Sequence, residues 1–169
     1  WTYGQPWGFE VALPSGFDYT LSGERTHRGA GFWRRLGVTL ADGSRLPDYG
    51  DGSILLPAGA DGVALMIFDN FRVIERYNPA DAYVIGVGHL SDRITGGPDF
   101  RASWPRDDRA LSGEERRELQ TRLTAAGFST DGVDGIIGPN TIEAVRRFQR
   151  SVGATPDGYA SVRVLERLR

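Results

Sequence analysis

The sequence predicts a two-part protein, with an α+β domain followed by an all-α domain, and three observations support this. Residues 1–68 contain short apolar stretches between turns, which are typical of strands. Residues 69–94 have the apolar spacing of helices, and residues 111–169 contain further helical patterns joined by Asp-Gly turns. The 169 residues are enough for two small cores. We therefore expect a first domain over 1–94, a linker over 95–110 and a second domain over 111–169.

The first part of the chain predicts four short strands. In residues 7–13, apolar side chains alternate with small or polar ones, the period-two pattern of a strand with one buried face. Three further strands are expected over residues 38–40, 53–56 and 63–68, with Asp-Gly turn dipeptides between them. Residues 23–35 are rich in Arg and Gly, and they predict either a short helix or a loop.

Residues 69–94 predict two helices that meet at a corner. Pro79 ends the first helix because proline lacks the N–H group that a helix interior requires. Asn78 is therefore expected at the corner with its side chain free, while the Tyr77 ring packs on the inner face of the first helix. The second helix starts near Asp81 and is apolar enough to be buried through Tyr83, Val84, Val87, Leu90 and Ile94.

The corner motif Tyr77-Asn78-Pro79-Ala80-Asp81-Ala82-Tyr83-Val84 resembles the last active-site motif of the membrane-bound lytic transglycosylase B family. Residues 1–97 as a whole resemble that family, although Ala80 and Val84 stand where the family has Ser and Ala. The resemblance implies the β-rich lobe and closing helices of a lysozyme-like catalytic domain. It also implies that Tyr77 and Asn78 support catalysis and that Tyr83 binds substrate.

Members of that family cleave the MurNAc-GlcNAc bond without water and leave 1,6-anhydromuramoyl ends, a carbon-oxygen lyase reaction that needs no cofactor. They use one Glu, followed by Ser, as general acid and base, and none of the glutamates in this sequence precedes a Ser. Glu75 is the nearest to the corner. Because it lies between Arg72 and Arg76, we expect a solvated ion pair rather than an acid with a raised pKa. The isolated chain is therefore expected to be inactive.

The last part of the chain predicts three helices built on a repeated turn. Ser112 and Glu115 form the capping box of the first helix, and residues 140–143 repeat that start for the second. Asp134-Gly135 recurs as Asp157-Gly158, 23 residues later (157 minus 134), and each pair precedes a helix.

The motif Asp134-Gly135-Ile136-Ile137-Gly138-Pro139-Asn140-Thr141, with Phe148-Gln149 after it, resembles the three-helix peptidoglycan-binding domain of cell-wall hydrolases and lyases. The resemblance implies binding of glycan strands and stem peptides. The candidate wall contacts are Asp134, Gly135, Gly138, Thr141 and Gln149. An alternative remains open, in which the Asp-Gly and Gly-Pro pairs of the motif only shape the turn.

Composition excludes several other classes of function. His27 and His89 are the only imidazoles and there is no Cys, so no metal site is expected. All 20 basic residues are Arg but they do not cluster, and the formal net charge is −2, which argues against nucleic-acid binding. No apolar run is long enough to span a membrane.

Together these observations favour the C-terminal part of a lytic murein transglycosylase from the periplasm of a bacterial cell envelope. The first residue is Trp1 rather than Met, so we expect further sequence upstream, including the catalytic Glu. Two alternatives stay open. The chain could be a non-catalytic wall-binding or scaffold protein, or the targeting part of another wall enzyme such as an amidase.

Overall fold

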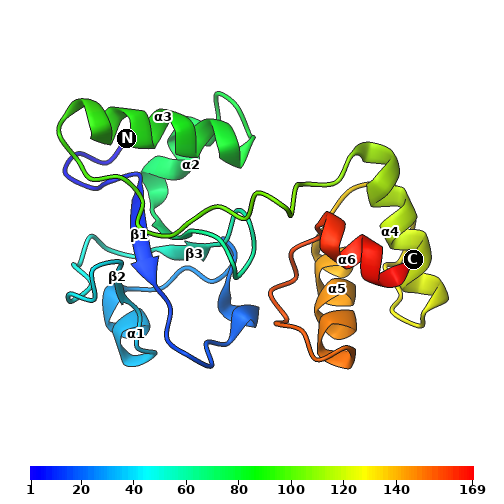
Figure 1. Ribbon diagram of the computed structural model, residues 1–169. Helices are drawn as coiled ribbons and strands as arrows, with labels where there is room; N and C mark the ends of the chain where they lie inside the picture. The colour runs from blue at the N-terminus through cyan, green and yellow to red at the C-terminus, as the bar shows by residue number, and fades with distance from the viewer. The chain divides into compact units, whose positions relative to one another are not determined.

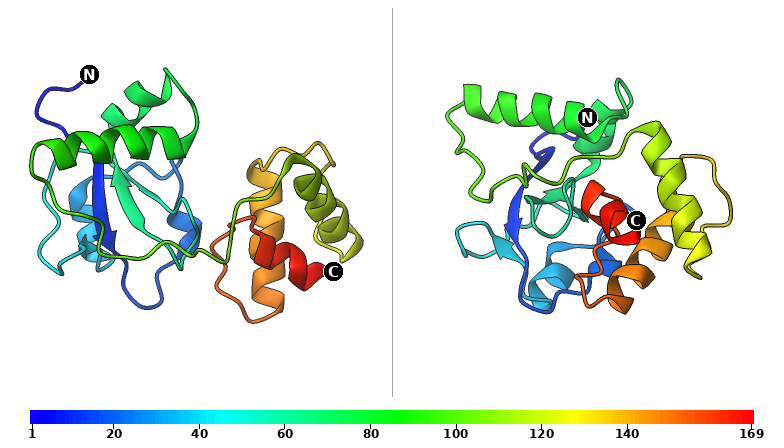
Figure 2. Two further views of the ribbon diagram at one scale, coloured as in Figure 1. Left: turned by 45° about the horizontal axis from the view of Figure 1, so that its top comes forward. Right: turned by 45° about the vertical axis from the view of Figure 1, so that its right-hand side comes forward.

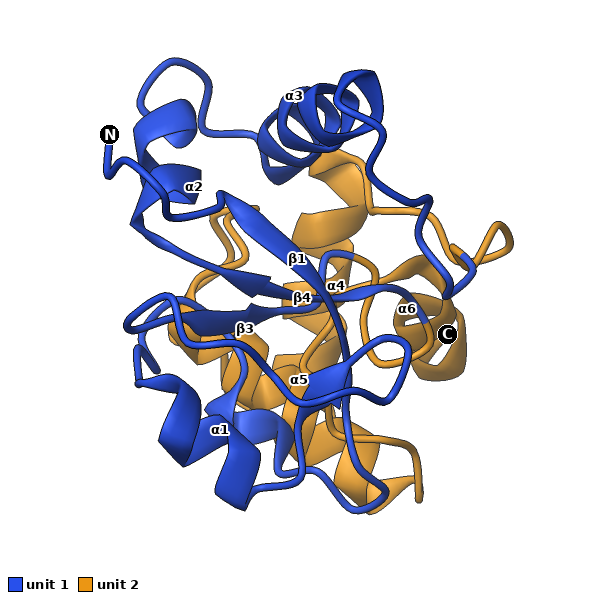
Figure 3. Ribbon diagram, turned by 90° about the vertical axis from the view of Figure 1, so that its left-hand side faces the viewer, with its two compact units in different colours: residues 1–57, 62–103 blue, residues 58–61, 104–169 orange.

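The computed structural model describes all 169 residues, which form two compact units (Figure 3). Unit 1 comprises residues 1–57 and 62–103, and unit 2 comprises residues 58–61 and 104–169. The predicted fold class, a mixed α+β part followed by an all-α part, is confirmed. The short segment 58–61 groups with the helical unit, which its position between two predicted strands did not suggest.

Unit 1 is organised around a four-stranded antiparallel sheet with strand order β2-β1-β4-β3. The strands are β1 (Gly8–Ala12), β2 (Thr39–Leu40), β3 (Ser53–Leu55) and β4 (Ala64–Ile67), which lie within the predicted segments. β1 is central and pairs with both β2 and β4. The segment of uncertain assignment contains the short helix α1 (Ala30–Arg35), and a 3₁₀ turn spans Tyr19–Leu21.

The two faces of this sheet are covered by different helices (Figures 1 and 2). α1 covers one face, and its Trp33 packs in a core with Ala64 and Met66 of β4. α2 (Asp69–Glu75) and α3 (Asp81–Ile94) cover the other face, where the alternate residues of β4, Leu65 and Ile67, are buried. Successive side chains of β4 therefore point to opposite faces of the sheet and enter two different cores, and all four of its residues are buried.

Helix α3 buries a face that shares only Val84 with the predicted one. Its buried residues are Val84, Ile85 and Gly88. Of the five residues predicted to be buried, Val84 is confirmed, and the other four are exposed, with exposed fractions of 36% at Tyr83, 40% at Val87, 60% at Leu90 and 76% at Ile94. The reason is close packing on Trp7, because a Cβ atom at Gly88 would lie 2.5 Å from ring atoms of the indole. Only glycine admits the ring there, and this fixes which face of α3 meets the sheet.

Unit 2 contains α4 (Gly113–Ala125), α5 (Pro139–Ser151) and α6 (Val162–Leu168), and α4 packs against both other helices. The capping box of Ser112 and Glu115 is present as predicted. The predicted start of α5 is wrong in detail, because its N-cap is Gly138 and Pro139 occupies the first turn, so no side chain caps it. The shared core is apolar, and its buried members are Leu111, Leu119, Leu123, Ala144, Val145, Phe148, Val164 and Leu165.

Candidate functional site

The corner between α2 and α3 presents two tyrosines on the surface of unit 1. Tyr77 is 83% exposed, and its ring lies 5.8 Å from the ring of Tyr83 at an interplanar angle of 30°. The expectation that the Tyr77 ring packs in the core is therefore wrong. The side chain of Asn78 is not free either, because its Oδ1 accepts the N–H of Ala80 at 3.0 Å. That bond holds the turn around Pro79 and leaves both phenol rings facing solvent.

Carboxylates surround this corner. Burial, and then repulsion from Glu24 and Asp81, raise the pKa of Glu75, while Arg72 opposes the rise. Burial and the charge of Glu24 likewise raise the pKa of Asp81. Arg72 pairs with Glu24 instead, at 3.4 Å. The predicted Glu75 ion pair with a lowered pKa is thus wrong, because Arg72 pairs with Glu24 rather than with Glu75.

In unit 2 the first Asp-Gly turn is held by Gln120 of α4, a residue outside the predicted motif. The Gln120 side chain is 1% exposed. Its Nε2 donates to Asp134 Oδ1 at 2.9 Å, to the Ile136 carbonyl at 3.0 Å and to Thr141 Oγ1 at 3.1 Å. Its Oε1 accepts the Gly135 N–H at 2.8 Å. We call Gln120, Asp134 and Gly135 the first clamp. Both polar atoms of the Gln120 side-chain amide are hydrogen-bonded within unit 2.

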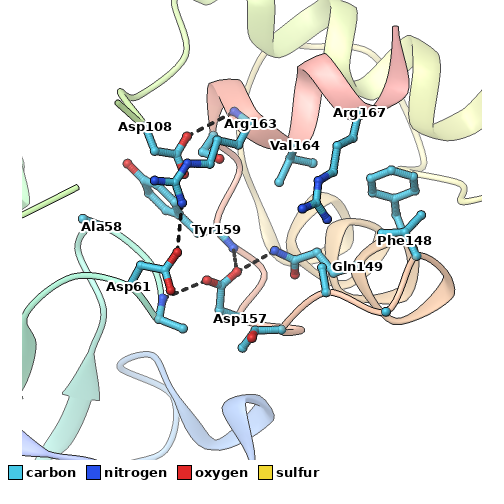
Figure 4. Close-up of a pocket in the computed structure, with 16 residues that line it drawn as sticks. Ala58, Asp61, Asp108, Phe148, Gln149, Asp157, Tyr159, Arg163, Val164 and Arg167 are labelled. Carbon is cyan, nitrogen blue, oxygen red and sulfur yellow. Dashed lines mark hydrogen bonds and ion pairs between the residues drawn. The ribbon is translucent and has the colours of Figure 1, made fainter. Parts of the chain in front are cut away.

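The second Asp-Gly turn is fastened in the same way by α5. Gln149 Nε2 donates to Asp157 Oδ1 at 2.6 Å, and Gln149 Oε1 accepts the Gly158 N–H at 2.9 Å. Asp157 Oδ1 also accepts the Tyr159 N–H at 2.9 Å. We call Gln149, Asp157 and Gly158 the second clamp. It borders a cavity of about 310 Å³, which Figure 4 shows between α6 and the turn.

The two clamps are copies with different surroundings. The glutamines stand 29 residues apart (149 minus 120), and an Arg precedes each by three positions, which is the sequence signal that could have revealed both. In the first clamp a hydroxyl, that of Thr141, lies against the glutamine amide. In the second clamp the outer carboxylate oxygen, Asp157 Oδ2, accepts the Ala60 N–H at 2.8 Å. The second clamp therefore presents a hydrogen-bond acceptor toward the cavity.

The structure separates the sequence-predicted wall contacts into two groups. Asp134, Gly135 and Thr141 bond within the first clamp, and the bonds from Gln120 and the Ile136 N–H lower the pKa of the Asp134 carboxyl. Gly138 serves as the N-cap of α5. Gln149 alone among them lines the cavity. The tyrosine corner belongs to unit 1, so the candidate residues are divided between the two units.

Neither site offers a metal centre. No group of three or more His, Cys, Asp or Glu side chains is placed to hold an ion. His27 Nδ1 lies 3.2 Å from Ser53 Oγ, and its Nε2 lies 3.6 Å from Asp69. His89 stacks on Phe100 at 4.0 Å. Both imidazoles thus have neighbours within the fold of unit 1. Separately, none of the helices combines the length and the apolar character that a membrane span requires.

Two stretches of the chain match known protein families. Residues 1–92 match the family described as Transglycosylase SLT domain, and residues 112–168 match the family described as Putative peptidoglycan binding domain. This chain belongs to the transglycosylase SLT family. The tyrosine corner therefore lies in the SLT domain, and both clamps lie in the peptidoglycan-binding domain.

Two solved structures resemble this chain over its whole length. The crystal structures of SltB3 from Pseudomonas aeruginosa, in complex with NAG-anhNAM-pentapeptide or NAG-NAM-pentapeptide, are 44% and 45% identical in sequence. Each superimposes with a TM-score of 0.93 over 100% of this chain, which spans 46% of the SltB3 chain.

The curated relatives are matched over shorter stretches. A spore cortex-lytic enzyme of Bacillus cereus is 43% identical over 60 residues, which are 36% of this chain and 23% of that enzyme. A probable N-acetylmuramoyl-L-alanine amidase of Bacillus licheniformis is 44% identical over 52 residues, 30% of this chain and 15% of that protein. This chain thus covers about a quarter or less of each of these curated relatives and less than half of the SltB3 chain.

Proposed function

We propose that this chain is the substrate-facing and wall-binding part of a lytic murein transglycosylase of the bacterial cell envelope. The similarity to SltB3 carries this proposal, because it extends over both domains with a TM-score of 0.93. The ligands of the SltB3 structures are peptidoglycan fragments, one of which contains an anhydromuramoyl residue. We assign the same polymer to this chain and place it in the periplasm.

The reaction of the complete enzyme is non-hydrolytic cleavage of the MurNAc-GlcNAc bond. A general acid protonates the glycosidic oxygen and then accepts the proton of the muramic 6-hydroxyl, which closes the anhydro ring. No glutamate of this chain precedes a Ser, so we place the acid outside these 169 residues. This chain alone then binds the wall without cutting it.

Within that enzyme the tyrosine corner serves as a supporting surface. The exposed Tyr77 hydroxyl orients the acid or the N-acetyl group of the substrate, and the Tyr83 ring beside it contacts sugar. Asn78 fixes the corner through its bond to the Ala80 N–H. An exposed pair of rings suits this role because pyranose faces pack on aromatic surfaces while hydroxyls remain free to hydrogen-bond.

Co-sedimentation with purified sacculi tests the binding half of the proposal. The intact chain is mixed with insoluble peptidoglycan, and the pellet and supernatant are compared with a matched incubation with chitin, which lacks stem peptides. We expect the chain to pellet with sacculi and to remain soluble with chitin. Protein that stays in the supernatant with sacculi would refute the wall-binding role.

A further inference from the structure

Helix α3 has two apolar faces, and only one of them packs within unit 1. The face that includes Val84 and Gly88 is buried against Trp7 and the sheet. The other face is exposed and carries large apolar side chains at steps of four, three and four along the helix, which are Tyr83, Val87, Leu90 and Ile94. We call these residues the α3 stripe. It is about 16 Å long and lies about 140° around the helix axis from the buried face.

We propose that the α3 stripe is an internal docking surface, and that its occupant is a helix from the part of the complete enzyme that lies outside these 169 residues. The proposal rests on the proposed function, which places the general acid in that part. It goes further by naming the surface of unit 1 that receives it. In the complete enzyme α3 is then buried on both of its apolar faces.

The continuity of the stripe separates it from ordinary exposed side chains. A single exposed leucine, such as Leu36 at the end of α1, is normal on a protein surface. The α3 stripe instead runs over three turns of the helix, and at Tyr83 it continues onto the Tyr77 ring, 5.8 Å away. A contiguous apolar surface of this kind marks a contact site, because a partner that covers it releases the water around it.

The charges around the stripe favour a protein occupant over a lipid surface. Arg93 is the only Arg or Lys of α3, and its Nε pairs with Asp99 at 3.1 Å. Asp81 and Asp92 add negative charge to the same helix. Helices that bind membrane surfaces carry several basic side chains beside the apolar face, which attract anionic headgroups. Because α3 lacks such a set, an apolar protein segment suits the stripe better.

The backbone beside the stripe suits an occupant that is itself a helix. Gly86 follows Tyr83 by three positions and precedes Leu90 by four, so it borders both side chains. A Cβ atom at Gly86 would meet nothing within 4 Å, so the backbone of α3 is uncovered at this point. A ridge of side chains next to a shallow groove is the surface pattern on which a second helix packs.

The N-terminus of unit 1 lies beside the helix pair that carries the stripe. The buried Asn70 of α2 accepts the Thr2 N–H at 2.7 Å, and its Nδ2 donates to the carbonyls of Thr2 at 2.8 Å and Gln5 at 2.6 Å. Figures 1 and 3 show the N-terminus next to α2, which packs against α3. A segment joined to Trp1 therefore starts close to the stripe. This chain spans 46% of the SltB3 chain, so an enzyme of that length has further residues from which to supply the helix.

The first residue of the stripe links docking to catalysis. Tyr83 lies beside Tyr77 at the tyrosine corner. A helix on the stripe extends to that corner, where the proposed enzyme needs its general acid within reach of the Tyr77 hydroxyl. A weaker contact at Leu90 should for this reason lower turnover as well as stability.

The first test is thiol labelling, which is clean because this chain contains no cysteine. Leu90→Cys and Ile94→Cys are each made in the 169-residue chain and in the complete enzyme, and peptide mass spectrometry follows their reaction with iodoacetamide. Both thiols should react at least about a hundredfold more slowly in the complete enzyme, because a docked helix must open before the reagent enters. Leu36→Cys is the matched control from the end of α1, and its rates in the two proteins should agree within about twofold.

The second test uses a substitution that keeps the isolated chain folded. Leu90 is 60% exposed, so Leu90→Ser should change the melting temperature of this chain by less than about 2 °C. In the complete enzyme the same substitution leaves a cavity in the docked contact and should lower the melting temperature of the catalytic domain by about 4–8 °C. Leu36→Ser should have the same small effect in both proteins.

Equal labelling rates in the two proteins, or an equal effect of Leu90→Ser on both, would overturn the proposal. Two further results would overturn it by indicating another occupant. Protection of the stripe thiols that rises with the concentration of the 169-residue chain itself indicates a second copy, and protection only by phosphatidylglycerol vesicles indicates a lipid surface.

Release of anhydromuropeptides from sacculi by the unsubstituted complete enzyme separates failure of this proposal from failure of the proposed function. An enzyme that cuts sacculi but leaves the stripe thiols reactive keeps the proposed function and loses this docking surface. An enzyme that protects the thiols but releases no anhydromuropeptides keeps the docking surface and loses the proposed function.

Discussion

Replacement of Gln120 by leucine should destabilise unit 2 more than the same replacement of Gln149. Leucine has nearly the same volume as glutamine but cannot hydrogen-bond, so the perturbation removes the polar contacts and keeps the packing. In the first clamp two groups without access to water lose a partner, the buried Gly135 N–H and the Thr141 hydroxyl. In the second clamp only the Gly158 N–H does so, because Asp157 is partly exposed.

Each buried polar group left without a partner costs about 1–3 kcal/mol, and the buried leucine recovers about 1 kcal/mol. The Gln120→Leu variant should therefore lose about 1–5 kcal/mol of unfolding free energy, with a central value near 3 kcal/mol, and Gln149→Leu about 0–2 kcal/mol. Because the two units can unfold separately, the assay is native-state hydrogen exchange of the α5 amides rather than one melting temperature. Equal losses in the two variants, or a loss below about 1 kcal/mol for Gln120→Leu, would refute the view that the first clamp is the structural one.

Three further predictions follow from other contacts. The Arg109 side chain and the Ser112 N–H lower the pKa of Glu115 from 4.5 to about 2, so its contribution to stability is present above pH 4.5 and is lost as the pH falls toward 2. Acid titration followed by circular dichroism should show this slope, and Glu115→Gln should reduce it. Gly88→Ala should destabilise unit 1 by about 1–3 kcal/mol through contact with Trp7, whereas Gly86→Ala on the same helix has open space and should stabilise it by up to about 1 kcal/mol, both measured by denaturant titration of tryptophan fluorescence. In the complete enzyme, Tyr77→Phe should leave the melting temperature unchanged because the ring is exposed. It should lower kcat about ten- to a hundredfold and change KM much less. Wild-type turnover of the variant on purified glycan strands would end the supporting role of Tyr77.

Local patterns predicted most of the elements in this fold. The Pro79 corner and the capping box at Ser112 each act through neighbours in sequence, and both are present. The buried face of α3 could not be read in this way. Two apolar stripes compete on that helix, and the choice between them depends on Trp7, a residue about 80 positions earlier that requires glycine opposite its ring.

In the candidate site, too, the local sequence predicted the turns but not the distant residues that hold them. The Asp-Gly turns were visible in the sequence, but the glutamine that fastens the first turn precedes it by 14 residues, and the second glutamine precedes its turn by 8. This unequal spacing hides the repeat from a search at one fixed offset. The bond from Ala60 to Asp157 joins residues 97 apart in sequence, so no local motif could indicate which clamp faces outward.

The most direct test of the central claim is the fate of sacculi incubated with the purified chain. We expect the protein to be recovered in the pellet with the peptidoglycan and mass spectrometry of the supernatant to find no anhydromuropeptides, since none of the chain's glutamates precedes a Ser. A complete enzyme such as SltB3, run in parallel, shows that the sacculi are cleavable. Anhydromuropeptides released by this chain alone would contradict the claim that it binds the wall without carrying the general acid.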